Sequence, residues 1–234
     1  MARTIDPDGH DAKRNSILDA AHVLVLSKGY DRMSIGDILA QLQISSGAFY
    51  HYFDSKPAIL DALVQRICEG SREPLQRVVD DPGLAAVDKL QAFLSTLDAL
   101  RRSRQQTILE LMRVWYDDHN AIVRQKVETA VRGMRLPMLA AIIEQGVREG
   151  AFVSRVADRS AEVVASLIEG MADHHAAAIL GFPGHRDERR FTREVIAIHT
   201  AYIEAIERAL GSPAGVLRRI GRRDVARWLA ALTR

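Results

Sequence analysis

The chain has 234 residues, and its 47% hydrophobic content is enough for a substantial core. The 32 basic and 30 acidic residues give a formal net charge of +2, which by itself identifies no partner. A single cysteine, Cys68, excludes an intrachain disulfide, and no run of about 18 apolar residues suggests a membrane span. The N-terminus is too polar for a secretory signal, so we expect a cytoplasmic protein.

Apolar residues recur at spacings of three and four along almost the whole chain, whereas a half-buried strand needs sustained alternation. The pattern therefore predicts an all-α protein. Glycines and prolines mark the expected joins, including Gly181, Pro183 and Gly184 between two long helices. The predicted helices cover approximately residues 11–28, 34–42, 45–51, 55–80, 84–103, 105–118, 120–149, 155–180, 187–209 and 214–232.

Three serines are placed to begin helices. Ser34 is followed three residues later by Asp37, which predicts a capping box in which each side chain accepts the other residue's backbone N–H. Ser45 is expected to cap a very short third helix, and Ser55, with Pro57 close behind it, to cap a long fourth helix. We therefore predict an N-terminal arm at residues 1–10 and a small three-helix domain, together residues 1–56, and a larger helical domain at residues 57–234.

The short helix that follows Ser45 is suited to enter the major groove of DNA. Such a helix must be short and exposed on one side, with its N-terminal residues nearest the bases. Small residues at its start let the backbone approach, and residues with polar tips at its end can donate to phosphates, which fix register without reading sequence. These residues are Ser46, Gly47 and Ala48 at the start, and Tyr50, His51 and Tyr52 at the end.

Small, aromatic and basic residues follow one another in a fixed order over about fifty positions. They are Ile17 to Ala21, Gly29 with Tyr30, Ser34 with Ile35, Asp37 with Ile38, the run from Ile44 to Phe53, and Lys56. In this order, residues 14–62 resemble the DNA-binding domain of the TetR family of transcriptional regulators. The resemblance implies that Ser34 and Tyr50 contact phosphates and that Lys56 holds the DNA backbone. It also implies that Ser46, Ala48 and His51 lie nearest the base edges.

Two positions depart from the family pattern. The turn between the two helices commonly holds glycine where this chain has Gln43, and alanine is common where it has Leu39. A non-glycine residue in a left-handed turn is strained but tolerated. We therefore expect a slightly different turn that keeps the DNA contacts.

The aromatic residues of this segment have a second interpretation, in which they only close a small helical bundle. Phe49 and Phe53, four residues apart on one helical face, suit that role. Tyr50, His51 and Tyr52 are three large residues with polar tips in a row, and they cannot all be buried. The run therefore favours a DNA interface.

The resemblance implies that the second domain binds a small-molecule effector and pairs with a second copy of the chain. Residues 155–180 are rich in alanine and glycine, which permits close helix approach. Residues 187–209 present apolar positions at helical spacing, namely Val195, Ile196, His199, Ile203 and Ile206. These faces either form a four-helix bundle between two copies or are internal core. A dimer would set two recognition helices about 34–36 Å apart, or a multiple of that distance.

Aromatic residues, methionines and isolated polar groups on apolar helices are candidates for the effector pocket, although each is also common in cores. The candidates are Phe93, Met112, Trp115, Tyr116, His119, Met134, Met138, Met171 and His174. Adjacent residues such as His174 and His175 point about 100° apart on a helix and do not easily share one ion. We therefore expect no metal site. The sequence also indicates no cofactor and no catalytic residue.

The segment from Gly211 to Arg234 holds six arginines and one acidic residue, with apolar residues that can line one side of a helix. A basic amphipathic helix of this kind can bind a membrane surface or make an additional DNA contact. It can also pack its apolar side on the protein and leave its arginines in water, which is the interpretation we favour.

The sequence thus predicts a DNA-binding transcriptional regulator that binds a palindromic operator as a homodimer and responds to a small-molecule effector. A repressor is favoured over an activator. One alternative is an enzyme that uses the region of His119 and His174, but the chain lacks a glycine-rich phosphate loop, a nucleophile elbow and metal-ligand spacing. Another is an architectural DNA-binding protein without sequence preference or effector.

Overall fold

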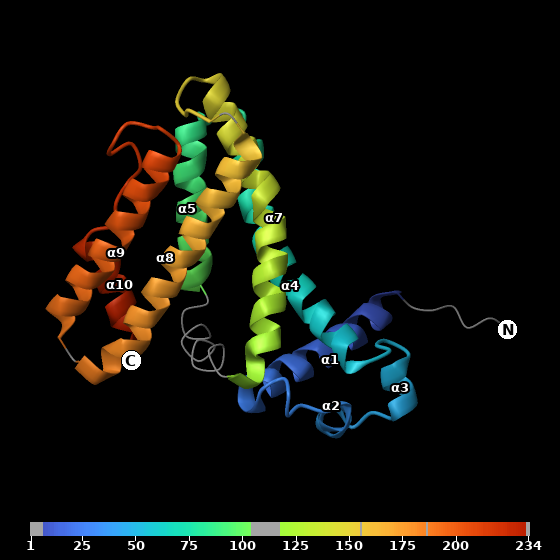
Figure 1. The fold of residues 1–234 in the computed structure, drawn as a ribbon. Helices are drawn as coiled ribbons and strands as arrows, with labels where there is room; N and C mark the ends of the chain where they lie inside the picture. The colour runs from blue at the N-terminus through green and yellow to red at the C-terminus, as the bar shows by residue number, and fades with distance from the viewer. Residues whose placement is uncertain (1–6, 104–117, 155, 186, 233–234) are drawn as a thin grey trace. The chain divides into compact units, whose positions relative to one another are not determined.

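The computed structural model describes residues 7–103, 118–154, 156–185 and 187–232, and the regular structure in these ranges is entirely helical (Figure 1). This confirms the predicted all-α class. The segment predicted as a helix at 105–118 lies, except for its last residue, outside the described residues. The helices are α1 (Pro7–Lys28), α2 (Ile35–Leu42), α3 (Ser46–Tyr50), α4 (Lys56–Asp80), α5 (Ala86–Ser103), the 3-10 turn η1 (Asp118–Asn120), α7 (Ala121–Arg148), α8 (Ala157–His185), α9 (Glu188–Ala209) and α10 (Arg222–Leu232).

The chain divides into two compact units. The N-terminal unit is Met1–Gly70 with Arg113–Ala130, and the C-terminal unit is Ser71–Met112 with Val131–Arg234. The division falls inside α4 and α7, so the first turns of α7 belong to the N-terminal unit. The predicted functional boundary at residue 56 stays a prediction.

The core of the N-terminal unit is formed by apolar residues that recur on one side of each helix. Ile17 on α1, Ile38 on α2 and Ile59 on α4 are fully buried. Phe49 and Phe53 are buried with them, and their ring centroids lie 6.2 Å apart. Burial of each such side chain contributes about 1.5–3 kcal/mol. The prediction that these two phenylalanines close the bundle is confirmed.

The predicted capping box begins α2. The Ser34 side chain accepts a hydrogen bond from the N–H of Asp37 at 3.2 Å, and the Asp37 carboxylate accepts one from the N–H of Ser34 at 2.7 Å. Lys28, at the end of α1, pairs with the same carboxylate at 2.5 Å. Hydrogen bonds from Lys28 and Ser34 hold the pKa of Asp37 well below its ordinary value. The box therefore also links the ends of α1 and α2.

Gln43 ends α2 in the left-handed conformation, with φ 52° and ψ 44°. Its N–H donates to the carbonyl of Leu39, which satisfies one of the carbonyls left open at the helix end. It is the one non-glycine residue with positive φ in the described part of the chain. The expected strained turn is therefore present.

Replacing Gln43 with glycine is expected to stabilise the protein by about 0.5–1 kcal/mol. Glycine removes the Cβ strain of the left-handed conformation, and its greater flexibility when unfolded offsets part of that gain. Gln43 is exposed, so the substitution loses no packing. Urea unfolding measures the change, and a loss of stability would show that the Gln43 side chain has a role of its own.

The helices of the C-terminal unit are joined by polar contacts as well as by apolar packing. The Glu149 carboxylate at the end of α7 accepts a hydrogen bond from the N–H of Ala86, which begins α5. Arg132 on α7 pairs with Glu169 on α8 at 2.5 Å. α8 and α9 pack side by side (Figure 1).

Helix α8 continues to His185, past Gly181 and Pro183, where we expected a break. Packing against α9 explains the difference, because the ring of Phe182 lies 4.8 Å from that of Phe191 and Ile179 is buried in the same cluster. Tertiary packing therefore outweighs the local effect of the glycine and the proline.

The other boundaries that differ have local causes. α1 begins at Pro7, one turn before the predicted Asp11, since proline is well tolerated in the first turn of a helix. The helix predicted at 214–232 begins only at Arg222. The N–H groups of Gly215 and Leu217 donate to the carboxylate of Glu207 and not to carbonyls of a preceding turn, so residues 211–221 form a loop.

Candidate nucleic-acid interface

The start of α3 is capped and open to solvent. The Ser45 side chain accepts a hydrogen bond from the N–H of Ala48 at 3.2 Å, as predicted. Ser46 and Gly47 are exposed, and no atom lies within 4 Å of the place that a Cβ on Gly47 would occupy. The protein itself does not require a small residue at Gly47. The open space suits close approach by another molecule.

The aromatic run at the end of α3 divides between core and surface. Phe49 is buried, whereas Tyr50 is 50% exposed with its ring edge-on to that of Phe49, 5.3 Å away. His51 is exposed and Tyr52 is partly buried. The structure thus leaves the polar tips of this run at the surface beside the start of α3.

Helix α1 supports this run through His10, which the sequence did not single out. The ring of His10 lies 4.7 Å from that of Tyr52 and 5.6 Å from that of His51. Nothing in the local pattern around His10 distinguishes it from other polar residues near the N-terminus. Its contacts come from the fold, which brings the first turns of α1 beside α3.

Lys56 is the first residue of α4, and its ammonium group is held on the protein. It donates to the carbonyl of Asp31 at 3.2 Å and lies 4.3 Å from the centre of the Tyr30 ring. Both partners belong to the turn between α1 and α2, residues 29–33, which leads directly into the exposed Ser34. The turn therefore fixes two of the residues that the family resemblance places on the DNA backbone.

A residue far along the chain holds this turn. Asn120, at the end of η1, is only 2% exposed, and its side-chain oxygen accepts a hydrogen bond from the N–H of Tyr30 at 2.8 Å. The carbonyl of His119 accepts one from the N–H of Asp31 at 3.3 Å. Gly29 has φ +84°, and a Cβ there would lie 2.9 Å from the Cβ of His119. Only glycine fits this close approach.

Nothing in the local sequence indicated this role for Asn120. The contact joins residues 90 positions apart, and an asparagine before a helix is common for purely local reasons. His119, which the sequence suggested as a ligand contact, lies in the N-terminal unit beside the turn.

The other predicted ligand contacts lie in the C-terminal unit or outside the described residues. Phe93 on α5, Met134 and Met138 on α7, and Met171 on α8 are buried. His174 is exposed, and its Nδ1 lies 2.9 Å from the carbonyl of Gly170 and 3.0 Å from the hydroxyl of Tyr202. Met112, Trp115 and Tyr116 lie outside the described residues. The ligand-binding role of all these residues stays a prediction.

The described residues contain no group of three or more His, Cys, Asp or Glu side chains that could hold a metal ion. In the same part of the chain, no helix is both long enough and apolar enough to cross a bilayer. Cys68 is buried on α4.

The fold and this surface define a helix-turn-helix protein: a short exposed helix follows a tight turn, and both are held on a small helical unit. Residues 17–63 match the family described as bacterial regulatory proteins, tetR family. This segment is therefore a DNA-binding domain of the TetR type, and the chain is a DNA-binding transcriptional regulator.

Similarity to individual proteins extends beyond this segment. The HTH-type transcriptional repressor KstR2 of Rhodococcus jostii (strain RHA1) is 24% identical over 155 residues, which are 64% of this chain and 73% of that protein. The HTH-type transcriptional repressor Rv1474c of Mycobacterium tuberculosis (strain ATCC 25618 / H37Rv) is 31% identical over 105 residues, which are 43% of this chain and 56% of that protein.

A solved structure extends the likeness to the fold of both units. SmeT, the repressor of the Stenotrophomonas maltophilia multidrug efflux pump SmeDEF, matches 90% of this chain and 95% of its own, with a TM-score of 0.60 and 17% identity. The predicted architecture, a helix-turn-helix domain followed by a helical domain, is confirmed.

Proposed function

We propose that the protein is a ligand-responsive repressor that binds a palindromic operator as a homodimer. The observation that carries the proposal is the exposed, capped start of α3 with polar side chains beside it. The names of two relatives favour repression over activation, since KstR2 and Rv1474c are both described as transcriptional repressors. A regulator of this kind acts in the cytoplasm, with the DNA.

In this proposal the DNA contacts come from α3 and from the two helix starts beside it. Tyr50, Tyr52 and Lys56 donate to phosphates. Ser34 does so once its hydroxyl leaves the Asp37 carboxylate, to which it donates at 2.6 Å in the free protein. The N-terminal residues of α3, with Ser45 and His51, lie toward the base edges. Few of these side chains are long enough for bidentate base reading. We therefore expect affinity to come mainly from placed phosphate contacts and from the second copy of the chain.

Replacing Tyr50 with phenylalanine tests the interface most selectively. The substitution keeps the ring that packs on Phe49 and removes only the hydroxyl. Loss of one phosphate hydrogen bond is expected to weaken DNA binding by about 10-fold and to leave unfolding unchanged. Tyr202→Phe removes a hydroxyl from the C-terminal unit and serves as the control. Equal DNA affinity of wild type and Tyr50→Phe would exclude a phosphate contact by this hydroxyl.

In the proposed homodimer, one side of α8 and α9 faces the second copy. The small and apolar residues noted on these two helices are largely buried within the single chain. They include Ala161, Ala165 and Ala176 on α8, and Val195, Ile203 and Ile206 on α9. Of the two alternatives for these residues, their burial within the single chain favours internal core.

The exposed sides of the same two helices remain available for pairing. Val163 and Ala177 on α8 are exposed, as are Ala197 and Ala201 on α9, and these side chains are small or apolar. Small residues allow two helix pairs to approach closely across a two-fold axis. We propose that these sides form the four-helix bundle of the homodimer.

Replacing Ala201 with arginine is expected to convert the dimer to a monomer. A long charged side chain in the centre of a close helix contact would lose its water without gaining a partner. Ala226→Arg, at an exposed alanine on α10, is the matched control and should remain dimeric. Sedimentation velocity distinguishes the two, and a dimeric Ala201→Arg protein would contradict this interface.

We propose that control by an effector needs only a difference in affinity between two conformations. In one of these conformations, the distance between the two α3 helices of the dimer does not match the operator. A ligand that binds this conformation more tightly lowers the fraction of operator that is bound. The buried residues Phe93, Met138 and Met171 are the described candidates for its site. Their apolar character favours an effector that is largely apolar itself.

A further inference from the structure

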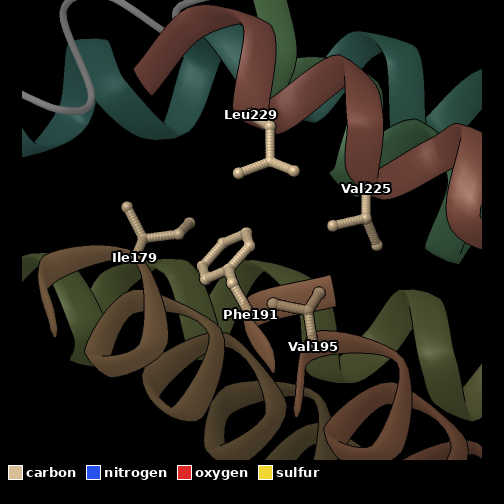
Figure 2. Close-up of a cluster of buried hydrophobic side chains, with 5 residues drawn as sticks. All are labelled: Ile179, Phe191, Val195, Val225 and Leu229. Atoms are coloured by element: carbon tan, nitrogen blue, oxygen red, sulfur yellow. The ribbon is translucent and has the colours of Figure 1, made fainter. Parts of the chain in front are cut away.

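The C-terminal helix α10 packs its apolar side on α8 and α9. Figure 2 shows Val225 and Leu229 of α10 pointing toward Ile179, Phe191 and Val195, and all five side chains are buried. The prediction that this segment packs on the protein is confirmed. Among the described residues of α10, the apolar side chains of Val225 and Leu229 are covered and are not available to a membrane surface.

The loop before α10 fixes the position of the helix. Glu207 on α9 is only 2% exposed, and its carboxylate accepts hydrogen bonds from the N–H groups of Gly215 and Leu217. The guanidinium of Arg219 pairs with the same carboxylate at 2.9 Å. Glu207 therefore pairs with Arg219 and anchors the loop that leads into α10.

Four arginines project from this segment into solvent, and we call them the arginine face. Arg222 and Arg223 are exposed, and the side chains of Arg218 and Arg227 are 67% and 59% exposed. Asp224 is the one acidic residue among them, and it pairs with both Arg218 and Arg227. The four arginines of the arginine face and Asp224 together carry a net positive charge.

The charge of the chain is concentrated in this segment. Residues 211–234 contain six arginines and one acidic residue, so the rest of the chain holds 26 of the 32 basic residues and 29 of the 30 acidic ones. Residues 1–60, which carry the helix-turn-helix, have six basic and seven acidic residues. Binding to DNA depends on neutralising phosphates with Lys and Arg. The helix-turn-helix region supplies no excess of these residues.

We propose that the arginine face of α10 is a second, sequence-independent contact with duplex DNA. The proposal rests on the proposed DNA-binding function and adds a source of phosphate neutralisation that α3 lacks. Three of these exposed guanidinium groups lie on the anchored helix and that of Arg218 lies on the loop before it, and such groups suit the oxygens of a phosphate backbone. Since no base reading is involved, the contact raises affinity for operator and for random DNA alike.

The test is the salt dependence of DNA binding by the double variant Arg222→Gln/Arg223→Gln. Two duplexes are needed: one of random sequence, and one selected by the wild-type protein from a random library. Removing one arginine–phosphate pair is expected to reduce the slope of log affinity against log salt by about 0.9, so the double variant should reduce it by about 2 in each protomer. Affinity for the two duplexes should fall by the same factor at a given salt concentration.

The control is Arg148→Gln/Arg208→Gln, which removes two exposed arginines from other helices of the same unit. The proposal is overturned if the α10 variant and this control have the same slope. It is also overturned if the wild type binds anionic lipid vesicles, the variant does not, and the DNA slopes agree. Neither result bears on the proposed DNA contacts of α3. Those contacts are contradicted instead if the wild-type protein selects no preferred sequence from the random library. Circular dichroism of both variants confirms that they fold.

Discussion

Replacing Glu207 with glutamine is expected to lower the free energy of unfolding by about 2–4 kcal/mol at neutral pH. The substitution keeps the shape of the side chain but removes the charge that Arg219 and two backbone N–H groups bind. Loss of one member of a buried ion pair leaves its partners poorly satisfied, which accounts for the size of the effect. Urea unfolding measures it.

Glu204 provides a control on the same helix. It lies 3.8 Å from Arg219 and is 44% exposed, so Glu204→Gln is expected to cost less than about 1 kcal/mol, as is usual for a surface pair. Equal costs for the two substitutions would show that Glu207 does not anchor the C-terminal loop.

The effect of Glu207 should depend on pH in a defined direction. Burial raises the pKa of this carboxyl, but hydrogen bonds from Leu217, Gly215 and Arg219 outweigh burial and hold the pKa below its ordinary value. A folded-state pKa below the unfolded value gives stability that is present above the unfolded pKa and lost as pH falls through the folded pKa. The difference between wild type and Glu207→Gln should therefore shrink below about pH 4.

Replacing Asn120 with leucine is expected to lower the free energy of unfolding by about 1–3 kcal/mol and to weaken DNA binding by about 5- to 10-fold. Leucine has a similar shape but leaves the buried N–H of Tyr30 without its acceptor. The turn of residues 29–33 then loses its support, and with it the carbonyl of Asp31 that holds Lys56. The second effect follows although Asn120 is not among the proposed DNA contacts.

Gln65→Met is the control for Asn120→Leu. The Gln65 amide donates to Glu69 on the exposed side of α4, so its loss is expected to change stability by less than about 0.5 kcal/mol. A plot of DNA affinity against salt for Asn120→Leu should keep the wild-type slope if the phosphate contacts are shifted but still formed. Unchanged DNA affinity in a destabilised Asn120→Leu protein would show that the turn does not position the contacts.

The features that could be predicted from sequence are those with local causes. The capping box at Ser34 and Asp37, the cap at Ser45 and the left-handed Gln43 each depend on residues within one or two turns. The TetR family pattern added the order of helices around them. The sequence therefore predicted α2 and α3 closely, together with the division of the aromatic run between core and surface.

The features that could not be predicted depend on contacts between distant residues. The Asn120 contact crosses 90 positions, and the ring contacts of His10 depend on the packing of α1 beside α3. The loop before α10 is not helical because a buried carboxylate on α9 competes for its N–H groups. None of these three effects leaves a periodic signal in the sequence.

The dimer surface shows the same limit. The content of small residues singled out α8 and apolar spacing singled out one face of α9, but neither signal distinguishes a face buried in its own chain from one buried against a partner. The structure shows that this chain already covers Val195, Ile203 and Ile206. The exposed alanines on the other side of α9 had no apolar pattern strong enough to be noticed.

The central claim, sequence-specific DNA binding through α3, is tested most directly by comparing two duplexes at one salt concentration. One carries the palindromic sequence that the wild-type protein selects from a random library, and the other is random. Fluorescence anisotropy should show the selected duplex bound at least about 10³-fold more tightly. Equal affinity for the two duplexes would contradict the claim, because the protein would then be a non-specific DNA-binding protein.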